Sequence, residues 1–122
     1  MDIQTTKKRF NNILILSIDA ISTFTISQLF TINDLQFGKA YLYGYYEEDF
    51  LYIATLYTYP QYRGLKYAST LLKRAIYEAK KNNCKMIKLM DHSDLFNHEN
   101  NIYLKHGFTY IDPGQPDMCY FI

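Results

Sequence analysis

The clearest hydrophobic pattern runs from Phe50 to Asn82, where an apolar stretch leads into a turn and then into a helical periodicity. Residues 50–58 are rich in aromatic and β-branched side chains, and they are followed by Pro60, which cannot donate to a sheet ladder. From Tyr67 onward, apolar residues recur at the spacing of one helix face, and charged residues occupy the other face. The pattern predicts a strand, a tight turn and an amphipathic helix in direct succession.

Shorter patterns predict the remaining elements. Residues 1–10 are polar and are expected to form a surface lead-in. The acidic corner at residues 47–49 predicts an antiparallel hairpin, and the helical crossover before residue 86 predicts a parallel strand pair. Apolar runs bounded by polar or turn-forming residues predict further strands over residues 13–18, 39–47, 86–90, 108–111 and 118–122. A last helix is expected to be capped by Asp94 or Asn97 and to end at Gly107.

Composition and charge limit the class of protein. The 122 residues predict a single domain, 1–122, and a content of 48% hydrophobic and 20% charged residues excludes wholesale disorder. A formal charge of +1 gives no electrostatic footprint for nucleic acid or an anionic membrane. The apolar run at residues 13–18 is too short to span a bilayer. We expect a soluble cytoplasmic protein, a monomer or homodimer, with no nucleic-acid or membrane partner.

The two cysteines, Cys84 and Cys119, form no CxxC motif, and no candidate cluster with histidine suggests a metal site. Reduced core cysteines of a cytosolic protein are the simpler interpretation, and a disulfide between them is the alternative. We therefore expect no metal.

The turn between the central strand and helix is a candidate anion site. The first turn of a helix leaves several N–H groups without intrahelical partners, and it carries the positive end of the helix dipole. Arg63, Lys66, Ser69 and Thr70 are placed to add side-chain contacts. The alternative is an ordinary strand-to-helix turn with solvated basic residues.

Two motifs around this turn resemble those of the GCN5-related N-acetyltransferases (GNAT). The segment Leu56-Tyr57-Thr58-Tyr59-Pro60-Gln61-Tyr62-Arg63-Gly64 is similar to the strand and acyl-CoA loop of that family, with Arg63 at the first loop position and Ala68 at the last. Lys66 stands where the family usually has a glycine. The segment from Asn97 to Phe108 is similar to the family's last helix and its Tyr-x-x-x-Gly-Phe ending.

The resemblance implies a fold and a reaction. The fold is α+β, a three-layer α/β/α sandwich with a mixed β-sheet of the acyl-CoA N-acyltransferase type, in which a short helix and a strand share residues 20–36. Acetyl-CoA is the implied cosubstrate, and a primary amine attacks its thioester directly. The corner Glu47-Glu48-Asp49 suggests an acidic lip that would attract a small cationic amine, although such corners are usually just solvated.

The resemblance also implies site residues. Backbone groups of Leu56 and Thr58 would hold the pantetheine arm, unless they take part in ordinary strand pairing. Tyr103 would donate its proton to the leaving sulfur, or would simply pack against the sheet. The pyrophosphate candidates are Arg63, Gly64, Leu65, Lys66, Tyr67, Ala68 and Ser69.

The general base is the least defined role. Ala54 and Thr55 stand where many relatives carry a strand carboxylate, so deprotonation of the amine would fall to His92, to Asp91 or to water. His98 and His106 are expected to be solvated helix residues.

Lys66 and the absent strand carboxylate leave a second function open, that of a non-catalytic acyl-CoA-binding or nucleotide-binding module. A tyrosine-rich protein-interaction module is a third. RNA binding is the least favoured, because the net charge is close to zero.

Overall fold

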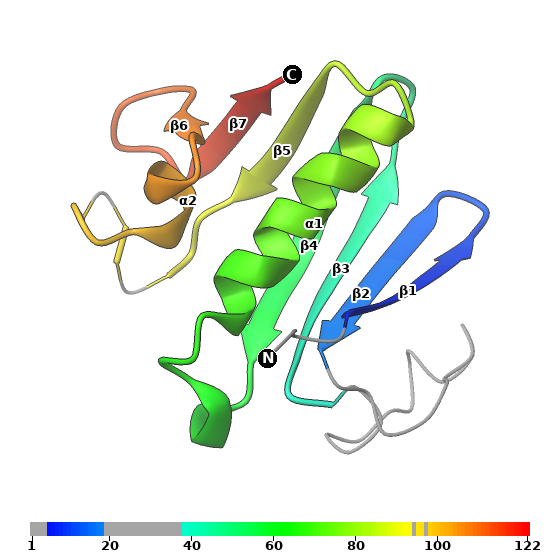
Figure 1. The fold of residues 1–122 in the computed structure, drawn as a ribbon. Helices are drawn as coiled ribbons and strands as arrows, with labels where there is room; N and C mark the ends of the chain where they lie inside the picture. Colours follow the sequence, from blue (N-terminus) through cyan, green and yellow to red (C-terminus); the bar gives the residue numbers. More distant parts are fainter. Residues whose placement is uncertain (1–4, 19–37, 94, 97) are drawn as a thin grey trace.

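A computed structural model of the chain describes residues 5–18, 38–93, 95–96 and 98–122 (Figure 1). These residues form a mixed seven-stranded sheet in the order β1-β2-β3-β4-β5-β7-β6. The predicted α+β class with a mixed sheet is confirmed, and the helix and strand expected within residues 20–36 lie outside the described residues. The elements are β1 (Thr5–Phe10), β2 (Ile13–Ile18), β3 (Ala40–Tyr46), β4 (Phe50–Thr58), the 3₁₀ turn η3 (Pro60–Tyr62), α1 (Tyr67–Lys81), β5 (Met86–Met90), α2 (Ile102–Lys105), β6 (Thr109–Tyr110) and β7 (Asp117–Phe121).

Strand β1 was not predicted. Residues 1–10 were expected to be a surface segment leading into the first strand, and this prediction is wrong for residues 5–10, which form β1. β1 pairs antiparallel with β2 along its whole length at the edge of the sheet. Asn11 adopts a φ of 53°, a left-handed conformation that asparagine tolerates in the two-residue turn of a hairpin. An edge strand has only one neighbouring strand and commonly carries Lys or Arg. The polar sequence of β1 therefore gave no hydrophobic pattern from which a strand could be predicted.

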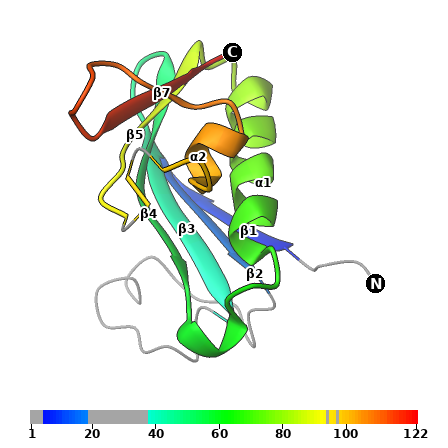
Figure 2. The same ribbon diagram turned by 90° about the vertical axis from the view of Figure 1, so that its left-hand side faces the viewer.

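The core lies between the sheet and α1, which crosses one face of it (Figures 1 and 2). The predicted apolar face of α1 is buried, with Leu71, Leu72 and Ala75 fully inaccessible. The buried carboxylate of Glu78 pairs with Arg74 at 3.1 Å, as the i, i+4 spacing predicts, and with Lys7 of β1 at 3.4 Å. This pairing connects the edge strand to the central helix.

Helix α2 packs against the same core as α1 and is shorter than expected. Its cap is Asn101, whose side chain accepts hydrogen bonds from the N–H groups of Tyr103 and Leu104, so the expected caps at Asp94 and Asn97 are wrong. Gly107 follows the helix with a φ of 93°, as expected for a left-handed ending.

Strand β4 leaves its neighbour β5 half-way along its length. The two strands pair in parallel, as predicted, from Phe50 to Ile53, but β4 continues to Thr58. The register of β4 against β3 shifts at the same place, because Ala54 is an extra residue without a partner on β3. Gly44 lies opposite this bulge, where a Cβ atom would come within 2.7 Å of the Tyr52 carbonyl oxygen. Bulges bend the strand that carries them. Among the described residues, no strand pairs with the second half of β4 on the side of β5, so its edge is open there.

Cys84 and Cys119 are buried and free, so the alternative of a disulfide is excluded. Among the helices of the described residues, none has the length and apolar character needed to cross a membrane.

Candidate functional site

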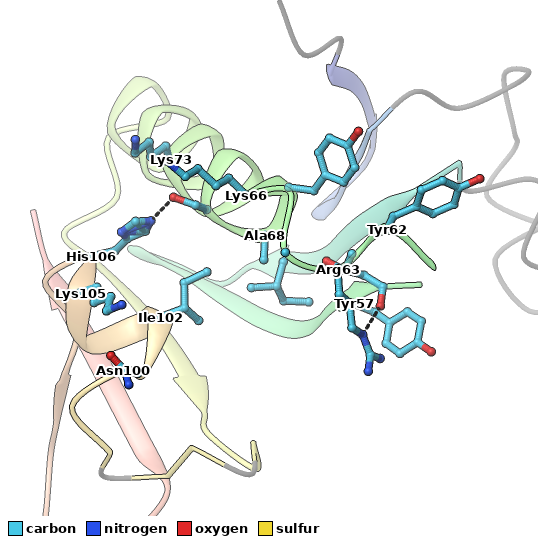
Figure 3. Close-up of a pocket in the computed structure, with 15 residues that line it drawn as sticks. Tyr57, Tyr62, Arg63, Lys66, Ala68, Lys73, Asn100, Ile102, Lys105 and His106 are labelled. Atoms are coloured by element: carbon cyan, nitrogen blue, oxygen red, sulfur yellow. Dashed lines mark hydrogen bonds between the residues drawn. The ribbon is translucent and has the colours of Figure 1, made fainter. Parts of the chain in front are cut away.

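A cavity of about 650 Å³ opens where the free edge of β4, the first turn of α1 and helix α2 meet (Figure 3). Helix α1 begins here because the chain reverses after η3 through Gly64 and Lys66, which have φ values of 82° and 66°. The residues that line the cavity are Leu56, Tyr57, Thr58, Tyr62, Arg63, Gly64, Lys66, Tyr67, Ala68, Ser69, Lys73, Asn100, Ile102, Lys105 and His106.

The backbone amides at the start of α1 are available to a ligand. Within the described part of the chain, the N–H groups of residues 64–69 donate to no protein acceptor, and no side chain caps the helix. The first bond of this region is donated by Thr70 N–H to the Lys66 carbonyl. Free amides at the positive end of a 15-residue helix form a favourable environment for an anion.

The open edge of β4 presents a second set of backbone groups. Successive residues of a strand direct their N–H and C=O groups to opposite neighbours. Tyr59 N–H donates to the Lys39 carbonyl on the β3 side, so the groups of Tyr57 also face β3, and those of Leu56 and Thr58 face the open edge. Arg63 Nε donates to the Thr58 carbonyl at 2.9 Å on this side. The N–H groups of Leu56 and Thr58 therefore point away from β3.

The charge in the cavity is positive. Arg63, Lys66, Lys73 and Lys105 line it, and no acidic residue is among the described lining residues. Arg63 also lies over the Tyr57 ring, with its guanidinium carbon 5.5 Å from the ring centre. A ligand with several negative charges suits this arrangement.

His106 joins the ends of the two helices, so its prediction as a solvated residue is wrong. Its Nε2 lies 2.6 Å from Ser69 Oγ, in the first turn of α1. Burial lowers the pKa of His106, and the nearby charge of Lys73 lowers it further. The imidazole is therefore mostly neutral at pH 7.

Tyr103 packs beside the cavity and is absent from its lining. Its ring contacts the core and lies 6.1 Å from the ring of Phe108. Burial raises the pKa of Tyr103 to about 12, with a smaller contribution from the charge of Asp91. In the described part of the chain, its hydroxyl makes no hydrogen bond.

Asp91 is buried and fully engaged by neighbouring donors. Its carboxylate accepts hydrogen bonds from Ser93 N–H and Oγ–H, from Asn101 Nδ2 at 2.7 Å and from Tyr110 Oη at 2.7 Å. Burial would raise the pKa of Asp91, but these hydrogen bonds outweigh it and lower the pKa. His92, the next residue, is exposed, and neither side chain lines the cavity.

Residues 29–108, two thirds of the chain, match the sequence model of the acetyltransferase (GNAT) family. The chain belongs to the GNAT family. No curated protein is similar enough in sequence to match.

Solved structures of GNAT proteins share the fold. The PaiA N-acetyltransferase of Thermoplasma acidophilum, in complex with coenzyme A, superposes with a TM-score of 0.66 at 22% identity, over 91% of this chain and 62% of that one. A GNAT acetyltransferase of Staphylococcus aureus gives 0.64 at 17% identity, over 91% and 68%. Tetrahymena GCN5 gives 0.63 at 14% identity, over 93% and 70%. The chain thus spans less than two thirds of the length of the PaiA enzyme.

The fold of this GNAT chain brings most of the predicted binding residues together. All line the cavity except Leu65, which is 54% exposed, and Thr70, whose hydroxyl donates to the Lys66 carbonyl at 3.0 Å. Sequence reasoning missed several lining residues, because they come from other turns of α1 and from α2: Lys73, Asn100, Ile102, Lys105 and His106, together with Tyr57 and Tyr62 beside the loop.

Proposed function

We propose that the protein transfers an acetyl group from acetyl-CoA to a primary amine. The observation that carries this proposal is the unpaired edge of β4 running directly into the uncapped N-terminus of α1, along a cavity lined by cations. Coenzyme A has the matching sequence of groups, since a diphosphate is joined to a flexible arm of amides that ends in the reactive thioester.

The backbone would hold most of the cosubstrate. The free amides of residues 64–69 would bind the diphosphate, and Arg63 and Lys66 would neutralise part of its charge. The N–H groups of Leu56 and Thr58 would bind carbonyl groups of the pantetheine arm as a neighbouring strand does. The thioester would then lie near Ala54, where β4 departs from β5.

In the proposed reaction, the neutral amine attacks the thioester carbonyl, a tetrahedral intermediate forms, and the carbon–sulfur bond breaks to release the thiolate. Tyr103 carries its proton at neutral pH, because its pKa is about 12. A thiol has a pKa of about 8.5, so complete proton transfer from this phenol to the thiolate would be uphill. We therefore assign Tyr103 the role of hydrogen-bond donor to the developing negative charge on sulfur.

The proton of the amine needs a different acceptor. Asp91 is a poor base because donors occupy its oxygens and its pKa is lowered. We assign this step to exposed His92, which directly follows the end of β5 and Asp91, or to solvent water.

The acidic corner gives no support to a preference for a cationic acceptor. Glu47, Glu48 and Asp49 join β3 to β4 at the end of the sheet opposite the cavity (Figure 1). Asp49 also lies 3.9 Å from the ammonium of Lys85. The proposal therefore specifies a primary amine and leaves its charge open.

Calorimetry with acetyl-CoA, together with release of free thiol in the presence of a panel of amines, tests the proposal. We expect saturable binding and amine-dependent thiol release from pH 6 to 9. Loss of the pH dependence in His92→Ala would assign the base to His92, and an unchanged profile would assign it to water. Binding without thiol release on any amine would instead identify a non-catalytic acyl-CoA-binding module, which the presence of Lys66 and the lack of a carboxylate at Ala54 and Thr55 favour. The absence of any binding would overturn both.

A further inference from the structure

The cavity contains more cationic groups than the turn after β4 provides. Arg63 and Lys66 belong to that turn, but Lys73 lies one helical turn beyond Ser69, about 6 Å farther along the axis of α1. Lys105 and His106 come from the end of α2, on the other side of the cavity.

These additional groups form a distinct cluster. In Figure 3, Lys73, His106 and Lys105 lie on the side of the cavity opposite Arg63 and Tyr57, with Ala68 and Ile102 between the two groups. His106 is fixed to α1 by its contact with Ser69 Oγ, 2.6 Å away. Two lysines, a half-buried imidazole and a hydroxyl from two helices thus line this side of the cavity, and no described lining residue is acidic.

We propose that Lys73, Lys105, His106 and Ser69 form a second phosphate subsite that binds the 3′-phosphate of coenzyme A. This inference rests on the proposed function, because it takes the amides of residues 64–69 as the site of the diphosphate. The two phosphate groups of the ligand are separated by a single ribose, and Arg63 lies on the opposite side of the cavity from Lys73, Lys105 and His106 (Figure 3).

The chemistry of the cluster suits a phosphate monoester. Such a group carries nearly two negative charges at neutral pH and offers three strong acceptor oxygens. The lysines and the Ser69 hydroxyl are donors, and the imidazole becomes a second ring donor when protonated. Burial, and then the charge of Lys73 on α1, lower the pKa of His106 and keep the imidazole neutral until an anion is present. Ser69 of α1 contacts its Nε2, and Lys105 lines the same cavity. Binding of the 3′-phosphate should therefore be coupled to uptake of a proton by His106.

Affinities for coenzyme A and 3′-dephospho-coenzyme A test the subsite in the full chain. We expect wild-type protein to bind coenzyme A at least about tenfold more tightly, since one charge-assisted contact accounts for that ratio. Lys73→Ala and Lys105→Ala should each reduce the ratio several-fold by weakening only the binding of coenzyme A. Lys80→Ala, which removes an exposed lysine from the far end of α1, is the matched control and should leave the ratio unchanged.

Proton uptake provides an independent measurement. Calorimetry in two buffers of different ionisation enthalpy should show more protons taken up with coenzyme A than with the dephospho form, and His106→Gln should abolish the difference. Titrating each ligand's phosphate separately corrects for its own proton binding. Equal affinities of wild-type protein for the two ligands would overturn the subsite but leave the proposed function intact. Failure to bind either ligand would overturn the proposed function as well.

Discussion

Lys66 holds the left-handed conformation immediately before α1, with a φ of 66° and a ψ of 20°. Glycine, the residue usual at this position of the family loop, adopts such a conformation without steric cost, whereas Lys66 carries a side chain, which lines the cavity. A side chain in this conformation costs about 1–2 kcal/mol of stability, and the free amides beside it are oriented despite that cost.

Comparison of Lys66→Gly with Lys66→Ala separates strain from charge. Both changes remove the ammonium and should weaken acetyl-CoA binding several-fold in calorimetry. The glycine variant relieves the strained φ, so its free energy of unfolding in urea should exceed that of the alanine variant by about 1 kcal/mol. Equal stabilities would show that the conformation is not strained, and unchanged affinity would remove Lys66 from the binding site.

Tyr103→Phe removes a hydroxyl without changing the shape of the ring. We expect kcat for thiol release to fall about 100-fold, the loss typical of one donor to a developing charge, while the Kd of acetyl-CoA stays constant. Tyr77→Phe, on the exposed side of α1, is the control. A wild-type rate in the Tyr103→Phe variant would refute its role in catalysis.

At the scale of elements, Asp91 connects three parts of the fold. It follows β5, and its partners are Asn101, which caps α2, and Tyr110 of β6. The segment between β5 and β6 is thus anchored at the carboxylate, and α2 is held where Lys105 and His106 face the cavity.

Asp91→Asn should destabilise the protein by about 2–3 kcal/mol in urea unfolding at pH 7, because it leaves buried donors without an acceptor. The pKa of Asp91 is lower in the folded protein, so its stabilising contribution is present above about pH 4 and is lost as pH falls through the folded-state value. The difference between variant and wild type should therefore shrink toward pH 3. Asp112→Asn, at an exposed position, should cost little at either pH.

The elements differ in how visible they are in the sequence. β2 and β5 have their predicted bounds, and β4 and α1 have nearly those expected, because each carries a strong local pattern of apolar residues. β1 was missed because a polar edge strand lacks such a pattern. The bulge at Ala54 is not visible either, since it is defined by the register against β3.

At the scale of the whole molecule, the candidate site was partly predictable. The turn after β4 has a local motif, and the positions of Arg63, Gly64 and Ser69 in the cavity follow from it. The contact of Ser69 with His106 joins residues 37 positions apart, and it depends on the packing of α2 beside α1. No local sequence pattern predicts a contact between residues so far apart in the chain. For this reason His106 was expected to face solvent.

The hydrogen bond from Arg63 to the Thr58 carbonyl folds the turn back onto the strand that precedes it. In the proposed complex, the turn that would receive the diphosphate is therefore tied to β4 before any ligand arrives, and its main chain would lose little freedom on binding. Most of the entropic cost of association should fall on the ligand's own flexible arm, so shortening or stiffening that arm would alter the affinity more than any tightening of the turn.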